Sequence, residues 1–206
     1  MNQGPLIFLG LLVTMALSWS GMILTPQLQI GRQAPEVQEE LGDIYPKDRP
    51  GLALQGADVY RSLGCAVCHT RQVRGGFPDI PRYGQRITVA ADYLFDAPVQ
   101  LGAQRVGPDL ANVGLRLPDA AWHWQHLYNP QIHAKGSVMP PYRFLFVTRK
   151  VGATPAPDAL VFPAGFAPKA GYEVVPTDAA RALVAYLQSL RVETPLFEAP
   201  MSAPTK

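Results

Sequence analysis

The residues with the most specific chemistry are two cysteines and a histidine, in the segment Cys65-Ala66-Val67-Cys68-His69. A C-x-x-C-H spacing lets two thiols add to the two vinyl groups of a haem, while the adjacent imidazole reaches the iron. We therefore predict one covalently bound haem c, attached to Cys65 and Cys68, with His69 as an iron ligand.

Two other uses of this cysteine spacing fit the sequence less well. A structural zinc site needs four ligands, and no second Cys or His pair follows at zinc-finger spacing. A thioredoxin-like redox pair precedes a helix in a βαβ unit, which this proline-rich sequence does not offer. The chain has only these two cysteines, so it has no disulfide framework either.

An electron-carrying haem needs a second axial ligand, and methionine sulfur is a common one because it favours ferrous iron. The chain has five methionines, of which Met139 alone lies between the apolar N-terminal segment and the C-terminal tail. Two prolines follow Met139 and stiffen the backbone behind its sulfur. We predict Met139 as the sixth ligand. A histidine is the rival, since three lie shortly upstream: His123, His126 and His133.

Two of these histidines fall on one predicted helix. Pro118-Asp119 opens that helix and Asn129-Pro130 closes it. His123 and His126 are three residues apart, so they share a helix face. A metal site, contact with a haem propionate and a plain surface role all remain open for them.

The segment Gly107-Pro108-Asp109-Leu110 resembles the one that class I cytochromes c use behind the haem. In those proteins the proline carbonyl accepts a hydrogen bond from the free N–H of the axial histidine. The resemblance implies that Pro108 orients His69 and tunes its basicity. A turn without such a role is the alternative.

These ligands must be positioned by a domain that follows an apolar N-terminal segment. Residues 1–31 contain no charged side chain, and residues 5–24 are long enough, at about 1.5 Å per residue, to cross a bilayer. A cleaved signal peptide is the alternative, but the segment lacks a basic start and a good cleavage site. We predict an uncleaved membrane anchor over residues 1–31.

The rest of the chain divides into three predicted parts. Residues 32–51 are polar and contain prolines, as expected of a tether, and residues 193–206 form a proline-rich flexible tail. The domain between them, residues 52–192, contains most of the 21 prolines, which favours short helices and long loops. Thr177 is the expected cap of a last helix that packs on the haem-bearing helix.

The apolar face of the haem-bearing helix is predicted from Val59, Leu63 and Val67, which places the cysteine motif at the end of that helix. Residues 147–175 are expected to form a small β-ribbon or a wrapped loop. The net charge is only +2 and the basic residues are scattered, so nucleic acid is not expected as a partner.

Together these motifs resemble the membrane-anchored mono-haem subunit, subunit II, of cbb3-type cytochrome c oxidases. The resemblance spans most of the chain; besides the anchor, it rests on the segments 60–69 with Arg74, 82–84, 96–98, 102–114, 122–130 and 139–142. It implies a mostly α fold with long loops, in which one transmembrane helix precedes a class I cytochrome c domain.

The resemblance also implies a function and partners. Such a subunit carries electrons from a donor cytochrome, or a further cytochrome c subunit, to the haem-copper catalytic subunit that reduces oxygen. It is not itself catalytic, because the iron changes valence and the protein places and tunes it. The implied location is the bacterial cytoplasmic membrane, as a single-pass protein with its haem domain in the periplasm.

The sequence departs from the family pattern at two places. Gln85, Arg86 and Ile87 stand where an aromatic residue and a serine are usual, and Leu101 stands where a tryptophan is usual. This stretch faces the large subunit in relatives, so a divergent docking surface is implied. Three other functions remain as alternatives: the cytochrome subunit of a nitric oxide reductase, a free-standing anchored electron shuttle and a haem-based gas sensor.

Overall fold

The computed structural model describes the chain apart from residues 1, 39–41, 77, 193 and 203–206. It contains two compact units, which are described separately. The first comprises residues 1–47 and 90–95, and the second comprises residues 48–89 and 96–206. Most regular structure is helical and the strands are few, which confirms the predicted fold class.

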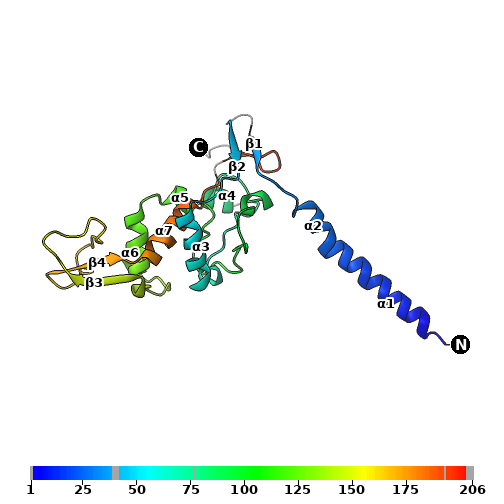
Figure 1. Cartoon of the computed structure of the whole chain (residues 1–206), viewed down its shortest axis with the longest axis horizontal. Coiled ribbons are helices and arrows are strands. Elements are labelled where there is room, and N and C mark those ends of the chain that lie inside the picture. Colours follow the sequence, from blue (N-terminus) through cyan, green and yellow to red (C-terminus); the bar gives the residue numbers. More distant parts are fainter. Residues whose placement is uncertain (1, 39–41, 77, 193, 203–206) are drawn as a thin grey trace. The chain divides into compact units, whose positions relative to one another are not determined.

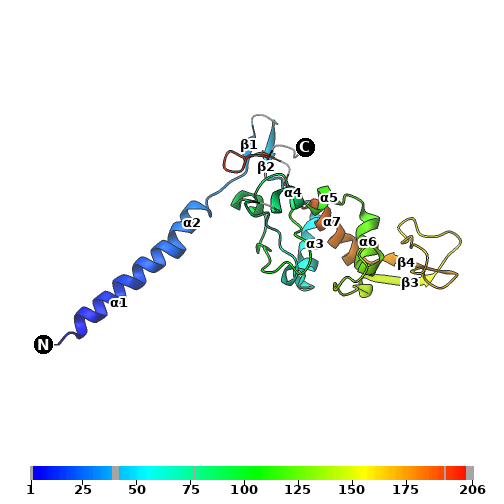
Figure 2. The same ribbon diagram turned by 180° about the vertical axis from the view of Figure 1, so that it is seen from behind.

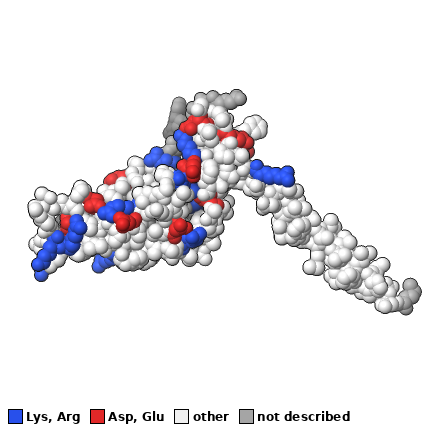
Figure 3. All heavy atoms as spheres, in the orientation of Figure 1, with Lys and Arg blue, Asp and Glu red and all other residues white. Residues whose placement is uncertain are grey.

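The first unit begins with a continuous helix of 26 residues, Gly4–Gln29, that is long and apolar enough to cross a membrane. It comprises α1 (Gly4–Trp19), a π-helical turn η1 (Ser20–Leu24) and α2 (Thr25–Gln29). None of its described residues is buried and none is charged, and Figure 3 shows charged atoms only beyond its C-terminal end. The helix continues beyond residue 24, the end of the apolar stretch identified in the sequence, and ends at Gln29.

The π-helical turn has a local cause in Pro26. A proline ring within a helix clashes with the carbonyl four residues earlier and removes one N–H donor. Here the N–H of Thr25 donates to the carbonyl of Ser20, five residues earlier, and its hydroxyl donates to the same oxygen at 2.9 Å. The wider turn accommodates the proline without ending the helix.

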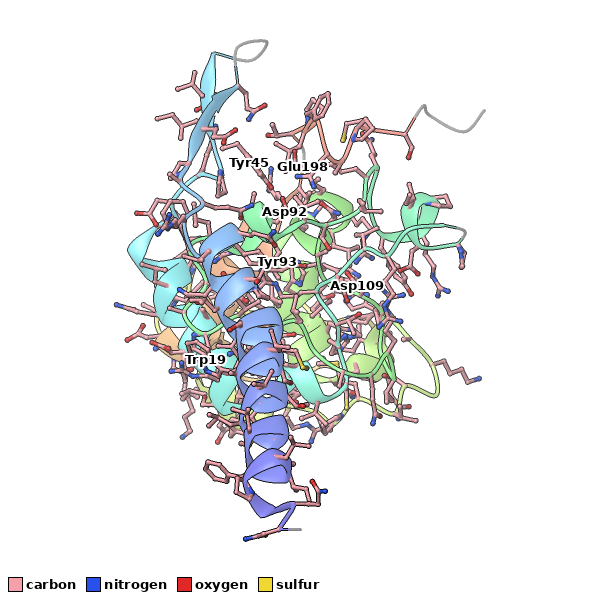
Figure 4. All side chains as sticks on the ribbon, turned by 90° about the vertical axis from the view of Figure 1, so that its right-hand side faces the viewer. Trp19, Tyr45, Asp92, Tyr93, Asp109 and Glu198 are labelled. Atoms are coloured by element: carbon pink, nitrogen blue, oxygen red, sulfur yellow. The ribbon has the colours of Figure 1, made fainter. Side chains whose placement is uncertain are left out.

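The polar segment after the helix contains a small hairpin that the sequence does not predict. Strands β1 (Glu36–Gln38) and β2 (Asp43–Tyr45) pair antiparallel, with Val37 opposite Ile44. The Tyr45 hydroxyl donates to Asp92 at 2.5 Å, from the 3-10 turn η3 (Ala90–Tyr93), and both side chains are labelled in Figure 4.

The second unit is built on two helices, α3 (Gly51–Ser62) and α7 (Asp178–Ser189), which lie side by side in Figures 1 and 2. A Cβ on Gly56 would lie 1.9 Å from the carbonyl oxygen of Ala182, so glycine is required for this close approach. The ring centroids of Tyr60 and Tyr186 are 5.3 Å apart beside the crossing. The predicted packing of the last helix on the haem-bearing helix is confirmed.

Shorter elements surround this pair of helices. The helices are α4 (Asp79–Tyr83), α5 (Val113–Arg116) and α6 (Ala120–Tyr128), and the 3-10 turns are η2 (Cys65–Val67), η4 (Pro130–Ile132) and η5 (Arg143–Leu145). The predicted caps are present: Asp119 accepts from the N–H of Ala121 at 3.0 Å, and Thr177 accepts from that of Ala180 at 3.3 Å. Most core residues come from α3, α6, α7 and the strands.

A two-stranded ribbon confirms one of the two expectations for residues 147–175. Strand β3 (Phe146–Lys150) pairs antiparallel with β4 (Tyr172–Pro176), and the residues between them form a long loop. Strand β4 leads directly into α7. The hydroxyl of Thr177, the N-cap residue of α7, donates to the carbonyl of Leu145 at 2.8 Å and so ties the start of the helix to the residue before β3.

The C-terminal segment, for which a loose tail is predicted, makes defined contacts with the domain. Leu196 and Ala199 are buried and bridge to each other. The Arg86 side chain is 1% exposed and donates to the carbonyl of Thr194 at 2.7 Å. Arg86, one of the departures from the family pattern, therefore holds this segment from inside the protein.

Candidate functional site

The cysteine motif follows α3 rather than lying on it. Gly64 has a left-handed conformation, with φ of 69°, and ends the helix. The motif then forms the 3-10 turn η2, in which the His69 N–H donates to the Cys65 carbonyl at 3.0 Å. Val67 is 66% exposed, so the predicted apolar face was wrong at this residue, although Val59 and Leu63 pack against the core.

No disulfide joins the two cysteines of this turn. Cys65 is partly buried and Cys68 is exposed. Burial raises the pKa of Cys65 to about 11, so this residue is a protonated thiol at neutral pH. The turn therefore places two cysteine side chains in the same short segment as the imidazole of His69.

The orientation of His69 is fixed by the backbone of residues 107 and 108. Its Nδ1 lies 2.7 Å from the carbonyl oxygen of Pro108, which has no hydrogen to donate, so Nδ1–H is the donor. In the neutral imidazole this leaves Nε2 with a free lone pair. A Cβ on Gly107 would lie 2.3 Å from Cε1 of His69, so the backbone lies directly against the ring.

Asp109 holds this backbone segment in place from within the core. It is 0% exposed and is labelled in Figure 4. Its carboxylate accepts from the Thr70 hydroxyl at 2.5 Å and from the N–H groups of Gln72 and Ala111, each at 2.8 Å. A second link joins the segments, because the Leu110 N–H donates to the Thr70 carbonyl at 2.8 Å.

Arg105 completes this buried network. Its guanidinium donates to both carboxylate oxygens of Asp79, at 2.6 and 2.7 Å, and also lies 3.3 Å from Asp109. The hydrogen bonds from Arg105 lower the pKa of Asp79, and those to Asp79 raise the pKa of Arg105. Charge pairing therefore braces the segment behind His69.

The segment 82–84 of the family pattern is joined to the same network through Tyr83. This side chain is 6% exposed, and the guanidinium carbons of Arg82, Arg105 and Arg116 lie 5.2, 5.1 and 5.4 Å from its ring centroid. Such cation–π contacts stabilise a cluster of like charges that would otherwise repel.

Met139 lies on the other wall of the site, in the loop after α6. The Tyr142 N–H donates to the Leu127 carbonyl at 2.8 Å, which ties the loop to the end of α6. The Met139 N–H donates to the Ser137 hydroxyl at 3.3 Å, and its side chain is partly buried against the core.

One cavity brings these residues together. The space between its walls is about 610 Å³, a volume that includes open solvent. Its lining is mostly apolar and includes Cys65, His69, Pro108 and Met139. The other lining residues are Tyr60, Leu110, Val113, Arg116, Leu117, Trp122, His123, His126, Leu127, Leu183 and Leu187.

Arg116 gives this apolar cavity a positive charge suited to an anionic group. Its guanidinium donates to the backbone carbonyl of Asp109, and no carboxylate side chain pairs with it among the described residues. Burial lowers the pKa of Arg116. An apolar cavity lined by a partly buried guanidinium, the thiol of Cys65, an oriented imidazole and a thioether, with Cys68 exposed three residues after Cys65, fits a haem with its propionates.

The three upstream histidines have different surroundings. His123 is 3% exposed, and its Nε2–H donates to the Leu117 carbonyl at 2.8 Å, so this nitrogen has a structural partner. His126 lines the cavity, and burial lowers its pKa to about 4. His133 is exposed and stacks on Trp122, with ring centroids 4.8 Å apart. In the described part of the chain, no three His, Cys, Asp or Glu residues group as metal ligands.

Gly107 and Arg116 belong to the site but are not predicted from the sequence. Gly107 had a signal, since a glycine directly before the proline of the 107–110 segment permits close backbone approach. Arg116 had none, because its position in the cavity depends on how α5 packs. A Cβ on Gly114 of this helix would lie 2.1 Å from the carbonyl oxygen of Gln188 on α7.

Comparison with known protein families gives one match. The family model for the mono-haem subunit of cytochrome c oxidase, FixO, matches residues 2–162, which include every residue predicted to hold the haem. The match ends in the loop between β3 and β4. A comparison with curated proteins finds no match. On the strength of the family match, the chain belongs to the mono-haem subunit family of cytochrome c oxidase and takes part in electron transfer as a subunit of that complex.

Proposed function

We propose that the thiols of Cys65 and Cys68 hold the haem covalently and that His69 and Met139 ligate its iron, with Pro108 orienting His69. The observation that carries this proposal is the 2.7 Å contact from His69 Nδ1 to the Pro108 carbonyl, on the wall of a cavity that Cys65 and Met139 also line. Thiol addition to a vinyl group needs no oxidant, because the S–H hydrogen ends on the neighbouring carbon.

The bound haem supplies a one-electron change between ferric and ferrous iron. The residues of the chain place and tune the iron, and none has to act as an acid, base or nucleophile. Apolar residues from α5, α6 and α7 exclude water from the cavity, which lowers the local dielectric constant. Arg116 would pair with a propionate, and the Met139 sulfur would favour the ferrous state.

The proposed route runs from a donor cytochrome, or a further cytochrome c subunit, to the haem-copper catalytic subunit of a cbb3-type oxidase. Residues 1–31 would anchor the protein in the bacterial cytoplasmic membrane as a single-pass helix. Residues 32–51 would act as the tether, residues 52–192 as the haem domain and residues 193–206 as the tail. Covalent haem attachment favours a periplasmic position for the domain.

One purification tests the proposal. The complex is extracted from membranes in mild detergent, its reduced pyridine haemochrome spectrum is recorded, and the co-purifying subunits are identified. We expect a c-type haem on this chain together with a haem-b and copper subunit that consumes oxygen rather than nitric oxide. A chain without covalent haem would contradict the attachment, and a haem-bearing chain that extracts alone would indicate a free-standing shuttle.

Carbon monoxide tests the ligation separately. A haem with both axial positions filled by the protein should not bind carbon monoxide when reduced. Binding by the wild-type chain would indicate an open iron site, as in a gas sensor, and would remove Met139 as a ligand.

A further inference from the structure

His126 is a polar side chain of the cavity that the proposed ligation does not use. It projects from α6 into the cavity lining. Its Nδ1 is shielded from solvent and has no hydrogen-bond partner among the residues that the structure describes. Native proteins rarely leave a buried polar atom unpaired, because its lost hydration is not replaced. The cavity is therefore expected to supply a partner for this nitrogen.

The imidazole of His126 is held in a fixed plane. Trp122, one helical turn earlier on α6, stacks on it with a centroid distance of 4.8 Å and an interplanar angle of 11°. Burial lowers the pKa of His126 to about 4, with smaller contributions from the neighbouring histidines. One ring nitrogen of a neutral imidazole carries a hydrogen, so Nδ1 can act as a donor.

The choice of acceptor follows from the other polar groups of the cavity. His69 already donates its Nδ1–H to Pro108, and Arg116 suits the anionic propionates. Tyr60 on α3 also lines the cavity, and its hydroxyl likewise has no partner among the described residues. Met139 belongs to the loop after α6, the helix that carries His126, and its thioether is a neutral acceptor. The hydrogen bond from Tyr142 to Leu127 ties the loop carrying Met139 to α6 at the residue next to His126.

We propose that the Nδ1–H of His126 donates a hydrogen bond to the sulfur of Met139 when the haem is bound, and that His126 thereby acts as a positioning residue that raises the reduction potential. This inference rests on the proposed function, in which Met139 is the sixth ligand. A donor on the sulfur withdraws electron density that would otherwise reach the iron. This loss stabilises the ferrous state relative to the ferric state.

Variants of His126 in the complete complex test the inference. His126→Phe keeps a ring on Trp122 but removes the donor, and His126→Leu removes both ring and donor. We expect each variant to shift the ferrous–ferric equilibrium about threefold toward ferric, the size of one weak hydrogen bond. In an optical redox titration this shift is about 30 mV to lower potential. His126→Gln restores an N–H donor, so its potential should return toward the wild-type value.

His133→Leu is the matched control. His133 also stacks on Trp122 but is exposed and does not line the cavity, so its removal should leave the potential unchanged. Equal shifts in His133→Leu and His126→Phe would overturn the inference, because general disturbance of α6 would then explain both. Equal potentials in the wild type and His126→Phe would also overturn it.

A spectroscopic readout separates this inference from the function on which it rests. Ferric haem with sulfur ligation has a weak charge-transfer band at the red end of the spectrum. If the wild type lacks this band, the ligation by Met139 fails. If the band is present, it should move in His126→Phe and return with His126→Gln. If the potential shifts while the band stays in place, His126 donates to a group other than the Met139 sulfur, and the proposed contact is overturned.

Discussion

The two walls of the haem cavity are held in different ways. The His69 wall, residues 69–72 and 105–111, is braced by buried charges, with Asp109 accepting three hydrogen bonds besides its contact with Arg105. The Met139 wall, α6 and residues 134–142, is held by apolar packing, stacked rings and a few backbone hydrogen bonds. Val138 next to the ligand is 78% exposed, whereas Thr70 next to His69 is 0% exposed.

This difference suggests that the two walls have different roles. The His69 wall fixes the position of one iron ligand, whereas the Met139 wall adjusts the properties of the other. Charged networks in a low-dielectric interior have one good geometry, so the orientation of His69 is set before any haem arrives. Packed aromatic rings and a proline-stiffened loop tolerate small changes. We therefore expect variants of the His69 wall to cost folding stability, and variants of the Met139 wall to change the haem more than the fold.

The largest effect is expected from Asp109→Ala. This change leaves the Arg105 charge less compensated and removes the acceptor for three donors, two of them backbone N–H groups. Each buried donor left without an acceptor costs about 1–3 kcal/mol, and three donors lose their acceptor here. We expect a strong loss of unfolding free energy and of haem-loaded protein, measured by denaturant titration and by haem content.

Asp58→Ala is the control for that experiment. Asp58 forms an exposed pair with Arg61 on α3, and exposed pairs contribute about 0–1 kcal/mol. A comparable loss of stability in both variants would show that buried charge does not distinguish the His69 wall.

The next largest effect is expected from acid, which should lower the folding stability by protonating His126 on the Met139 wall. Its folded pKa of about 4 lies below the ordinary value of 6.5, so the unfolded chain binds a proton that the folded chain does not. The stability that depends on neutral His126 is therefore complete above pH 6.5 and falls as the pH drops toward 4. At about 1.4 kcal/mol per unit, the loss between pH 6.5 and 4.5 is about 2–3 kcal/mol.

His126→Gln isolates this contribution, because glutamine does not titrate. Denaturant unfolding at pH 7 and pH 4.5 should show a smaller acid loss in the variant than in the wild type. If both lose the same free energy, the acid sensitivity comes from other groups, and His126 is not buried as a neutral ring.

On the His69 wall, Gly107→Ala should also lower the folding stability, but by less than Asp109→Ala. The added Cβ would lie 2.3 Å from Cε1 of His69, so the ring or the backbone must move. Overpacking of this kind costs about 1–3 kcal/mol. We expect lower stability together with an altered haem spectrum, because the displaced ring belongs to a ligand.

Gly75→Ala is the matched control, since its Cβ would meet only the Ile87 side chain at 3.8 Å. An unchanged spectrum in Gly107→Ala would mean that the His69 ring moves freely, contrary to the description of this wall as rigid.

Local patterns of the sequence predict the elements of the site well. The C-x-x-C-H spacing, the caps Asp119 and Thr177, and the apolar stripe of α7 each depend on neighbouring residues, and the helices form where they indicate. The predicted apolar face failed at Val67 because of a local feature of the chain. Gly64 ends α3 early, so Val67 leaves the helical register and lies exposed.

The same local patterns do not predict contacts between segments that are distant in the sequence. Arg116 and Asp109 look like surface charges in the sequence, and only the packing of α5 on α7 places Arg116 in the cavity. The burial of Arg86 also depends on a partner 108 residues away, the carbonyl of Thr194. Partners of buried polar groups are specified by the tertiary fold, for which composition and periodicity carry no signal.

The smallest effect on folding, and the most specific effect on the haem, is expected from Met139→Leu. Leucine has a similar volume and no polar atom to satisfy, so the unfolding free energy should fall by less than about 1.5 kcal/mol. The sulfur ligand is nevertheless lost, so the reduced variant should bind carbon monoxide, which is measured by the change in its optical spectrum.

The comparison of the two walls depends on this separation of stability from ligation. His69→Ala removes a ligand from the braced wall and leaves the Pro108 carbonyl without its donor. We therefore expect His69→Ala to lower both haem retention and stability, whereas Met139→Leu should retain its covalently attached haem and nearly all its stability. If Met139→Leu destabilises the protein as strongly as Asp109→Ala, the Met139 wall is as rigid as the His69 wall. The contrast between placing and tuning would then not hold.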